Sequence, residues 1–130
     1  MAGMNMDDGS VLDGWSHVCQ SVHILFTTEF FTRVMRAYVG SNVIRLLGEL
    51  TVPQTVQRIR TAIAIAIDLF EPRLDPYKVD LVAMDGTGTS TWIIQCIYMP
   101  NALQGDFTPA GIRSLTIDPS VVTSLLVVAQ

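Results

Sequence analysis

The chain has 130 residues, of which 49% are hydrophobic and only 15% charged, with a formal net charge of −4. A typical soluble chain is roughly 25% charged, so we expect this one to bury apolar surface against partner proteins. The acidic balance argues against nucleic-acid binding, which needs clustered Lys and Arg. The longest apolar runs, at 62–67 and 125–129, are far shorter than the roughly 18 residues of a membrane-spanning helix. We therefore expect a single-domain soluble subunit of an assembly, with neither nucleic acid nor membrane as its partner.

The first residues and the cysteines predict the compartment. The N-terminus lacks the basic and apolar stretches of a signal peptide, so we expect the protein to stay in the cytoplasm. Cys19 and Cys96 lie outside any CxxC or Cys/His ligand pattern, which predicts buried, reduced thiols rather than a zinc or dithiol site. Seven of the eight basic residues are arginine, the cation that protein interfaces favour.

The N-terminal part combines an arm with a helix. Residues 1–14 are polar and without periodicity, which predicts a flexible arm. Ser16 can act as the N-cap of a short helix that ends at 27–28. The apolar stripe of this helix consists of Val18, Val22, Leu25 and Phe26. Residues 33–39 then alternate in polarity, which fits either a short strand or an extended loop.

Two further helices are predicted next, a short one over 41–49 and a long one. Thr51 can cap the long helix, and Pro53 suits its first turn. Its apolar residues recur at spacings of three, four, four and three, in Val56, Ile59, Ile63, Ile67 and Phe70. This pattern predicts a helix of about 18 residues that ends before Pro72.

A β-hairpin is predicted where the apolar period changes from 3.6 to 2 after Pro76. Val79 and Leu81 belong to its first strand, the Gly/Thr-rich segment 85–89 forms the turn, and residues 91–99 form the second strand. One side of the second strand carries Trp92, Ile94, Cys96 and Tyr98. Its other side is also apolar enough to need a cover.

The C-terminal residues 100–130 predict a β-rich extension. Residues 100–111 contain prolines and glycines and are typical of a loop, and two β-branched runs follow at 112–117 and 121–129. The predicted fold is therefore α+β, with N-terminal helices including one long helix, then an antiparallel hairpin or sheet, then a β-rich tail.

No pattern of catalytic or metal-binding residues emerges. A glycosidase needs two carboxylates with opposed pKa shifts, and the candidate acids Glu29, Glu49, Asp68 and Glu71 are scattered. His17 and His23 fall on different helix faces, so they form no two-point metal site. We expect no catalytic, cofactor or metal site, and keep two alternatives: a peptidoglycan-cleaving enzyme that uses Glu29 or Glu71, and a homo-oligomeric structural module.

One local string is distinctive, Phe70-Glu71-Pro72-Arg73-Leu74 at the end of the long helix. Pro72 can be a simple helix stop, with Glu71 and Arg73 as ordinary polar loop residues. Alternatively, the rigid turn presents a carboxylate and a guanidinium in a fixed arrangement that docks a partner through charge-assisted bonds.

In its context this string resembles the contractile-tail baseplate protein W family of phages, pyocin-like particles and type VI secretion systems. The matching pieces are Cys19-Gln20-Ser21-Val22, Thr27-Thr28, Arg33-Val34-Met35, Gly40-Ser41, Leu46-Leu47, Glu71-Pro72-Arg73-Leu74 and Val79. They occur in order within residues 15–99, which we take as the family domain. The chain departs from the family at Phe70, where many relatives carry Trp, and in residues 100–130, which extend past the family core.

The resemblance implies a non-enzymatic wedge subunit of the virion tail baseplate, present in six copies and assembled in the host cytoplasm. Its partners would be baseplate wedge proteins and tail sheath subunits, with tail tube or hub proteins as further candidates. The loop with the Glu-Pro-Arg motif would dock on the wedge, and either Val79–Met84 or Thr91–Met99 would accept a sheath strand. The implied partner-binding residues are Phe70, Glu71, Pro72, Arg73, Val79, Leu81, Trp92, Ile94 and Cys96.

Overall fold

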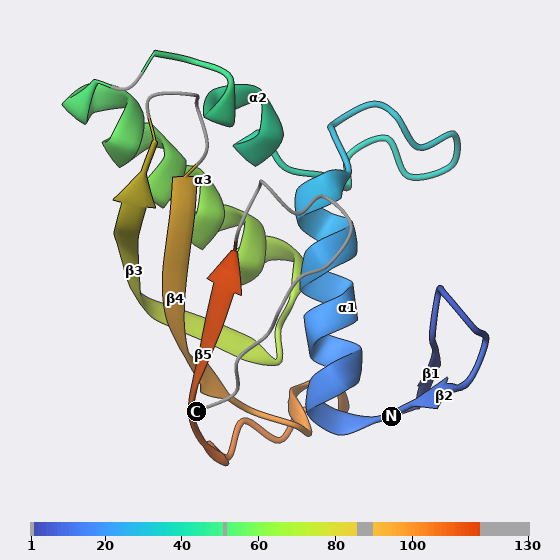
Figure 1. Ribbon diagram of the computed structural model, residues 1–130. Helices are drawn as coiled ribbons and strands as arrows, with labels where there is room; N and C mark the ends of the chain where they lie inside the picture. Colours follow the sequence, from blue (N-terminus) through green and yellow to red (C-terminus); the bar gives the residue numbers. More distant parts are fainter. Residues whose placement is uncertain (1, 51, 86–89, 118–130) are drawn as a thin grey trace.

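A computed structural model describes residues 2–50, 52–85 and 90–117. The fold is α+β, as predicted, and it places helices against a three-stranded antiparallel sheet (Figure 1). The elements are β1 (Gly3–Met4), β2 (Val11–Leu12), α1 (Gly14–Thr27), α2 (Val43–Leu47), α3 (Pro53–Phe70), β3 (Leu74–Met84), β4 (Ser90–Tyr98), the short 3₁₀ helix η1 (Ala102–Gln104) and β5 (Gly111–Ile117). Among the described residues, no helix has both the length and the apolar character to cross a bilayer.

Helix α1 begins earlier than its predicted cap. Asp13 is the N-cap, and its carboxylate accepts a hydrogen bond from the Gly14 N–H at 2.8 Å. The prediction that Ser16 caps the helix is wrong because Ser16 already lies in the first turn, where its hydroxyl donates to the Asp13 carbonyl. The predicted apolar stripe is confirmed, since all four of its residues are buried.

Helix α3 confirms the strongest periodic signal of the chain and is 18 residues long. Ile59, Ile63 and Ile67 are almost completely buried and form its core face. Pro53 occupies the first turn, where its missing N–H costs nothing. Thr51, the predicted cap, lies outside the described residues, and Val52 occupies the N-cap position without a side-chain bond.

The three-stranded sheet has the order β3-β4-β5, so β4 is its central strand. Val79 pairs with Ile94, and Ile94 pairs in turn with Leu115 on the other side. The antiparallel pairing of the two predicted hairpin strands is confirmed, whereas residues 86–89 of the predicted turn lie outside the described residues. The inward alternation of β4 is confirmed too, since Trp92, Ile94, Cys96 and Tyr98 are buried. The opposite face of β4 is only partly covered. Strand β5 confirms the first β-branched run, whereas the second run at 121–129 lies outside the described residues.

The N-terminal arm contains the small hairpin β1-β2, which contacts α1. The Gln20 side chain donates to the Met4 carbonyl at 2.9 Å and accepts from the Met6 N–H at 3.1 Å. Gly3 packs so closely on His17 that a Cβ would lie 2.3 Å from the ring nitrogen Nε2. The arm is therefore held on the face of α1 that carries His17 and Gln20.

The segment between α1 and α2 is a loop, which decides between the two alternatives for residues 33–39. Figure 1 shows it projecting away from the helices and the sheet. The Ser41 N–H donates to the Thr28 carbonyl at 2.9 Å, and the buried Ser41 hydroxyl reaches the Leu25 carbonyl at 3.2 Å. At Gly40, a Cβ would lie 2.8 Å from the backbone of Glu29 and Phe30. The base of the loop is therefore closed by backbone contacts that exclude a side chain.

We predict that Gly40→Ala lowers the free energy of unfolding by about 1–3 kcal/mol, because the backbone of Glu29 and Phe30 must shift. Gly48→Ala is the matched control, since its Cβ would meet only ordinary contact at 3.6 Å, and it is expected to be neutral or slightly stabilising. Urea unfolding of both variants measures the difference. Equal stabilities would contradict the close approach.

Candidate functional site

The Glu71-Pro72-Arg73 corner joins the end of α3 to the start of β3. The Glu71 N–H still donates to the Ile67 carbonyl at 2.9 Å, as in a helix, but its φ of −126° and ψ of 81° are not helical. Pro72 accounts for this, because its ring disfavours helical geometry in the preceding residue. The Leu74 N–H then donates to the Glu71 carbonyl at 3.1 Å, which turns the chain into β3.

Glu71 and Arg73 form a buried, two-pronged ion pair. Arg73 donates from Nε to Glu71 Oε1 at 2.5 Å and from Nη2 to Oε2 at 2.9 Å. Glu71 is 3% exposed and Arg73 6% exposed. This fork-to-carboxylate geometry is among the strongest hydrogen-bond arrangements in proteins.

The same guanidinium also joins the corner to α1. Arg73 Nη1 lies 3.1 Å from His17 Nδ1, and arginine can only donate. Nδ1 of His17 must therefore accept, so the ring carries its proton on Nε2. The Arg73 carbonyl in turn accepts from the Met99 N–H at 2.9 Å, just after β4. One residue thus connects α1, the end of α3 and the end of β4.

The corner therefore differs from the one expected from the sequence. The sequence left two alternatives for Glu71 and Arg73, ordinary polar loop residues or charged groups that face a partner. The structure agrees with neither, because the two charged groups bind each other inside the fold. Pro72 is exposed, and Phe70 is half-buried. The outer surface of this corner therefore consists of the apolar groups of Pro72 and Phe70, and the buried ion pair holds them in a fixed position.

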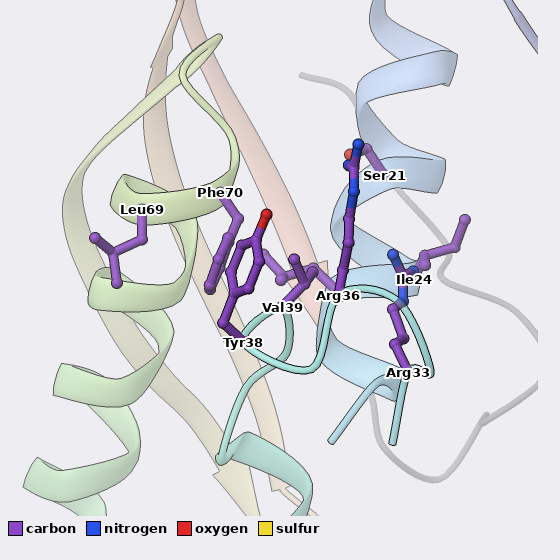
Figure 2. Close-up of a pocket in the computed structure, with 9 residues that line it drawn as sticks. Ser21, Ile24, Arg33, Arg36, Tyr38, Val39, Leu69 and Phe70 are labelled. Carbon is purple, nitrogen blue, oxygen red and sulfur yellow. The ribbon is translucent and has the colours of Figure 1, made fainter. Parts of the chain in front are cut away.

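Phe70 lines a pocket between α1, the loop after α1 and the end of α3 (Figure 2). The pocket has a volume of about 470 Å³ and includes Arg33, Arg36 and Tyr38. The sequence analysis did not select these three residues for binding. The signal that could have indicated them is the combination of arginines and large apolar residues in the segment 33–39, which the structure shows to be a loop.

The predicted hairpin residues are mostly part of the core. Trp92, Ile94 and Cys96 are fully buried, and the indole N–H of Trp92 donates to the Ser90 hydroxyl at 2.8 Å. Val79 is also buried, while Leu81 is partly buried. These side chains fill the protein's own interior, so a partner strand would meet the backbone and not these groups.

The sheet order also decides which of the two strands proposed to accept a sheath strand has a free edge. Because β4 is hydrogen-bonded to β3 and to β5, Thr91–Met99 is excluded as an acceptor of a further strand. In the described part of the chain, β3 pairs with β4 alone. Irregular register flanks its run Lys78–Leu81, with the exposed Tyr77 and Val82 at the irregular positions.

The four candidate acids differ in their surroundings. Glu71 is the only buried carboxylate among the described residues, and both its oxygens accept from Arg73. Glu49 lies 3.9 Å from Arg58, and Glu29 and Asp68 are exposed. The described residues hold no group of three metal-binding side chains. Because Arg73 binds both oxygens of Glu71, this carboxylate is not placed to act as the acid or nucleophile of glycoside hydrolysis.

Both cysteines are buried and free, which confirms the prediction of reduced thiols. Burial raises the pKa of the Cys19 thiol to about 11 and that of the Cys96 thiol to about 12. Because the thiolate is the reactive form, neither group is suited to redox or nucleophilic chemistry near neutral pH.

We predict that Arg73→Ala and Glu71→Ala each lower the free energy of unfolding by about 3–5 kcal/mol, because each leaves the other charge buried without its partner. The control is Arg58→Ala, which breaks an exposed pair whose side chains are 66% and 46% accessible and should cost less than about 1 kcal/mol. Urea unfolding measures all three. A similar small loss in all of them would contradict a structural role for the corner pair.

Comparison with known proteins identifies the family. Residues 13–99 match the family described as Baseplate wedge protein gp25. Baseplate protein W of Escherichia phage P2 is 30% identical over 90 residues, which cover 68% of this chain and 78% of that protein. The resemblance seen around the Glu-Pro-Arg motif is therefore confirmed.

Solved structures agree with this assignment. A chain of the postcontracted baseplate of pyocin R2 superposes with a TM-score of 0.66 at 26% identity, over 75% of this chain and 98% of that one. A chain described as a putative tail lysozyme from Geobacter sulfurreducens (TM-score 0.64, 20% identity, 84% of this chain and 93% of that one) shares the fold. A chain of the anti-feeding prophage baseplate (TM-score 0.55, 20% identity, 90% and 78%) does so too. The protein thus belongs to the gp25 baseplate wedge family and is a structural component of the baseplate of contractile tails.

Proposed function

We propose that this chain is a non-enzymatic wedge subunit, present in six copies per baseplate, that docks on other wedge proteins and starts the tail sheath by accepting a sheath strand. The proposal rests on the outer edge of β3, which pairs with no other strand among residues 2–50, 52–85 and 90–117. An extended segment of another chain can add to such an edge through main-chain hydrogen bonds, while side chains at alternate positions fix its register.

The geometry of β3 supports a restricted site for strand addition. Lys78–Leu81 pair with β4 in regular register between two irregular positions. Pro76, just before them, lacks an N–H donor. The Lys78 ammonium also pairs with Asp80 at 2.8 Å. Prolines, bulges and charges protect an edge strand against pairing with unrelated chains. In β3 they leave only the short segment Lys78–Leu81 for the addition of a specific strand.

Docking on the wedge is assigned to the outer side of the Glu71-Pro72-Arg73 corner. Since the charged groups of the corner bind each other, their contribution is to hold Pro72 and Phe70 in a fixed position. A preformed apolar edge of this kind lowers the entropy cost of association. The six copies follow from the family resemblance, and the anti-feeding prophage baseplate is described as six-fold symmetrised.

A proline scan over Lys78, Val79, Asp80 and Leu81 tests strand addition. In an antiparallel strand the N–H groups of adjacent residues point to opposite edges. Proline at every second position of the scan therefore removes an N–H that donates to β4, and proline at the positions between them removes an N–H that points outward. The variants that lose only an outward-pointing N–H, called the outward variants, are recognised by a free energy of unfolding within about 1 kcal/mol of the wild type. We expect these to enter baseplates but to abolish sheath growth, measured by electron microscopy of purified particles. Normal sheaths on such particles would refute strand addition at β3.

The alternative of a peptidoglycan-cleaving enzyme is favoured by one observation, the fold shared with a chain described as a putative tail lysozyme. The binding of both Glu71 oxygens by Arg73 opposes it. We predict no clearing by the purified chain on a peptidoglycan zymogram, with lysozyme as positive control. Clearing that disappears in Glu29→Gln, or in a Glu71→Gln variant that keeps its urea stability, would establish the enzyme instead.

A further inference from the structure

The pocket beside Phe70 is not explained by strand addition at β3. Its walls come from three separate segments, namely α1, the loop after α1 and the last turn of α3. Figure 2 shows the side chains of Arg33 and Arg36 extending from the loop toward α1, with the Tyr38 ring on the side of Phe70. The pocket therefore combines two cations with an aromatic wall.

The two arginines of the pocket have no acidic partner within the described fold. None of the residues that line the pocket is acidic, and the ion pairs of the described residues involve other cations. What distinguishes Arg33 and Arg36 is that both lie in one pocket of a chain whose net charge is −4. A local positive site on an acidic protein favours a negatively charged partner.

The apolar part of the pocket is exposed as well. Tyr38 is 67% exposed and Leu69 66% exposed, although both are large. On the same loop, Val34 is 96% and Met35 93% exposed. Contiguous exposed apolar groups of this kind mark protein interaction sites. A small free anion would leave these groups in water, so the chemistry fits a peptide segment that carries both carboxylates and apolar side chains.

The loop is held in a defined shape in the absence of a partner. The Phe31 N–H donates to the Ala37 carbonyl at 2.8 Å, and the Val39 N–H donates to the Arg36 carbonyl at 3.1 Å. Phe31 has a φ of 66°, a left-handed conformation that is unfavourable for a bulky residue and persists only where the surroundings impose it. The arginines and Tyr38 are thus presented by a preformed loop, which favours specific binding.

We propose that this arginine pocket binds an acidic, apolar segment of a second baseplate protein, with its carboxylates on Arg33 and Arg36 and an apolar side chain against Tyr38, Leu69 and Phe70. Arginine pairs with carboxylates through two parallel hydrogen bonds, which fixes the orientation of the segment. The inference rests on the proposed function and gives its wedge-docking step a partner of defined chemistry.

Site-specific cross-linking in the assembled particle tests the occupant. A photoreactive phenylalanine analogue replaces Tyr38, baseplates are purified from the producing cells, and the cross-linked peptide is identified by mass spectrometry. We expect one segment of another baseplate protein that contains Asp or Glu next to apolar residues. The same analogue at Phe107, an exposed aromatic residue elsewhere on the surface, is the control and should not capture that segment.

Charge reversal then tests the mechanism. The double variant Arg33→Glu/Arg36→Glu should keep its urea stability, since both side chains are exposed, but should enter baseplates at least about tenfold less than the wild type. Changing the captured acidic residues to Arg should restore entry. Arg45→Glu/Arg58→Glu changes the net charge equally on other exposed positions and should enter normally.

The outcomes separate this inference from the proposed function. Capture of a second copy of this chain, capture of a segment without acidic residues, or normal entry of the Arg33/Arg36 variant would overturn the arginine pocket alone. Failure of strand addition is recognised differently, because outward proline variants of β3 would then carry normal sheaths. Charge-swap rescue together with sheathless β3 variants would support both.

Discussion

Burying one carboxylate and one guanidinium at the junction of α3 and β3 is the constraint on which the rest of the fold depends. Either group alone would be costly to remove from water, so Glu71 and Arg73 must be close together whenever the core is formed. Pro72 between them ends the helix and forces the turn that allows the two side chains to meet. Through His17 and the Met99 N–H, the same arginine orients α1 and the end of β4.

The position of this pair explains why a three-residue string can identify the family without being a contact surface for charges. A partner that approaches the corner meets Pro72 and the edge of Phe70, while the ion pair determines where these lie. In the proposed docking on the wedge, loss of either charge acts through the shape of the corner. In the same proposal, a surface substitution beside the corner weakens docking without changing stability, so an assembly experiment separates the two kinds of residue.

The sequence predicted the fold best where one local period dominates. The spacing of Ile59, Ile63 and Ile67 is enough to define α3, and the alternation from Trp92 to Tyr98 defines the buried face of β4. It could not predict which strand is central, because that depends on β5, which pairs with β4 after an intervening loop. Both candidate strands are apolar, so only the pairing distinguishes the edge strand β3 from β4.

The sequence pointed to the residues of the Glu71-Pro72-Arg73 corner, but not to their role in the fold. The motif contains Glu71 and Arg73, yet nothing local shows that they bind each other, since that depends on the turn imposed by Pro72. The arginine pocket was missed for a different reason. Arg33, Arg36 and Tyr38 line one pocket with Leu69 and Phe70 in a fold where the hydrogen bond from the Ser41 N–H to the Thr28 carbonyl closes the base of the loop. Such long-range closure has no periodic signature.

The two proposed surfaces lie on different sides of the molecule. The edge of β3 is at one side of the sheet, whereas α1 and the loop lie toward β5 (Figure 1). A partner in the arginine pocket and a strand on β3 can therefore be bound at the same time. The elements between them, α3 and the sheet, share one hydrophobic core and are joined at its end by the Glu71–Arg73 pair. An initiator needs this arrangement, because a sheath strand added at β3 has a fixed direction only if β3 is itself fixed relative to the baseplate.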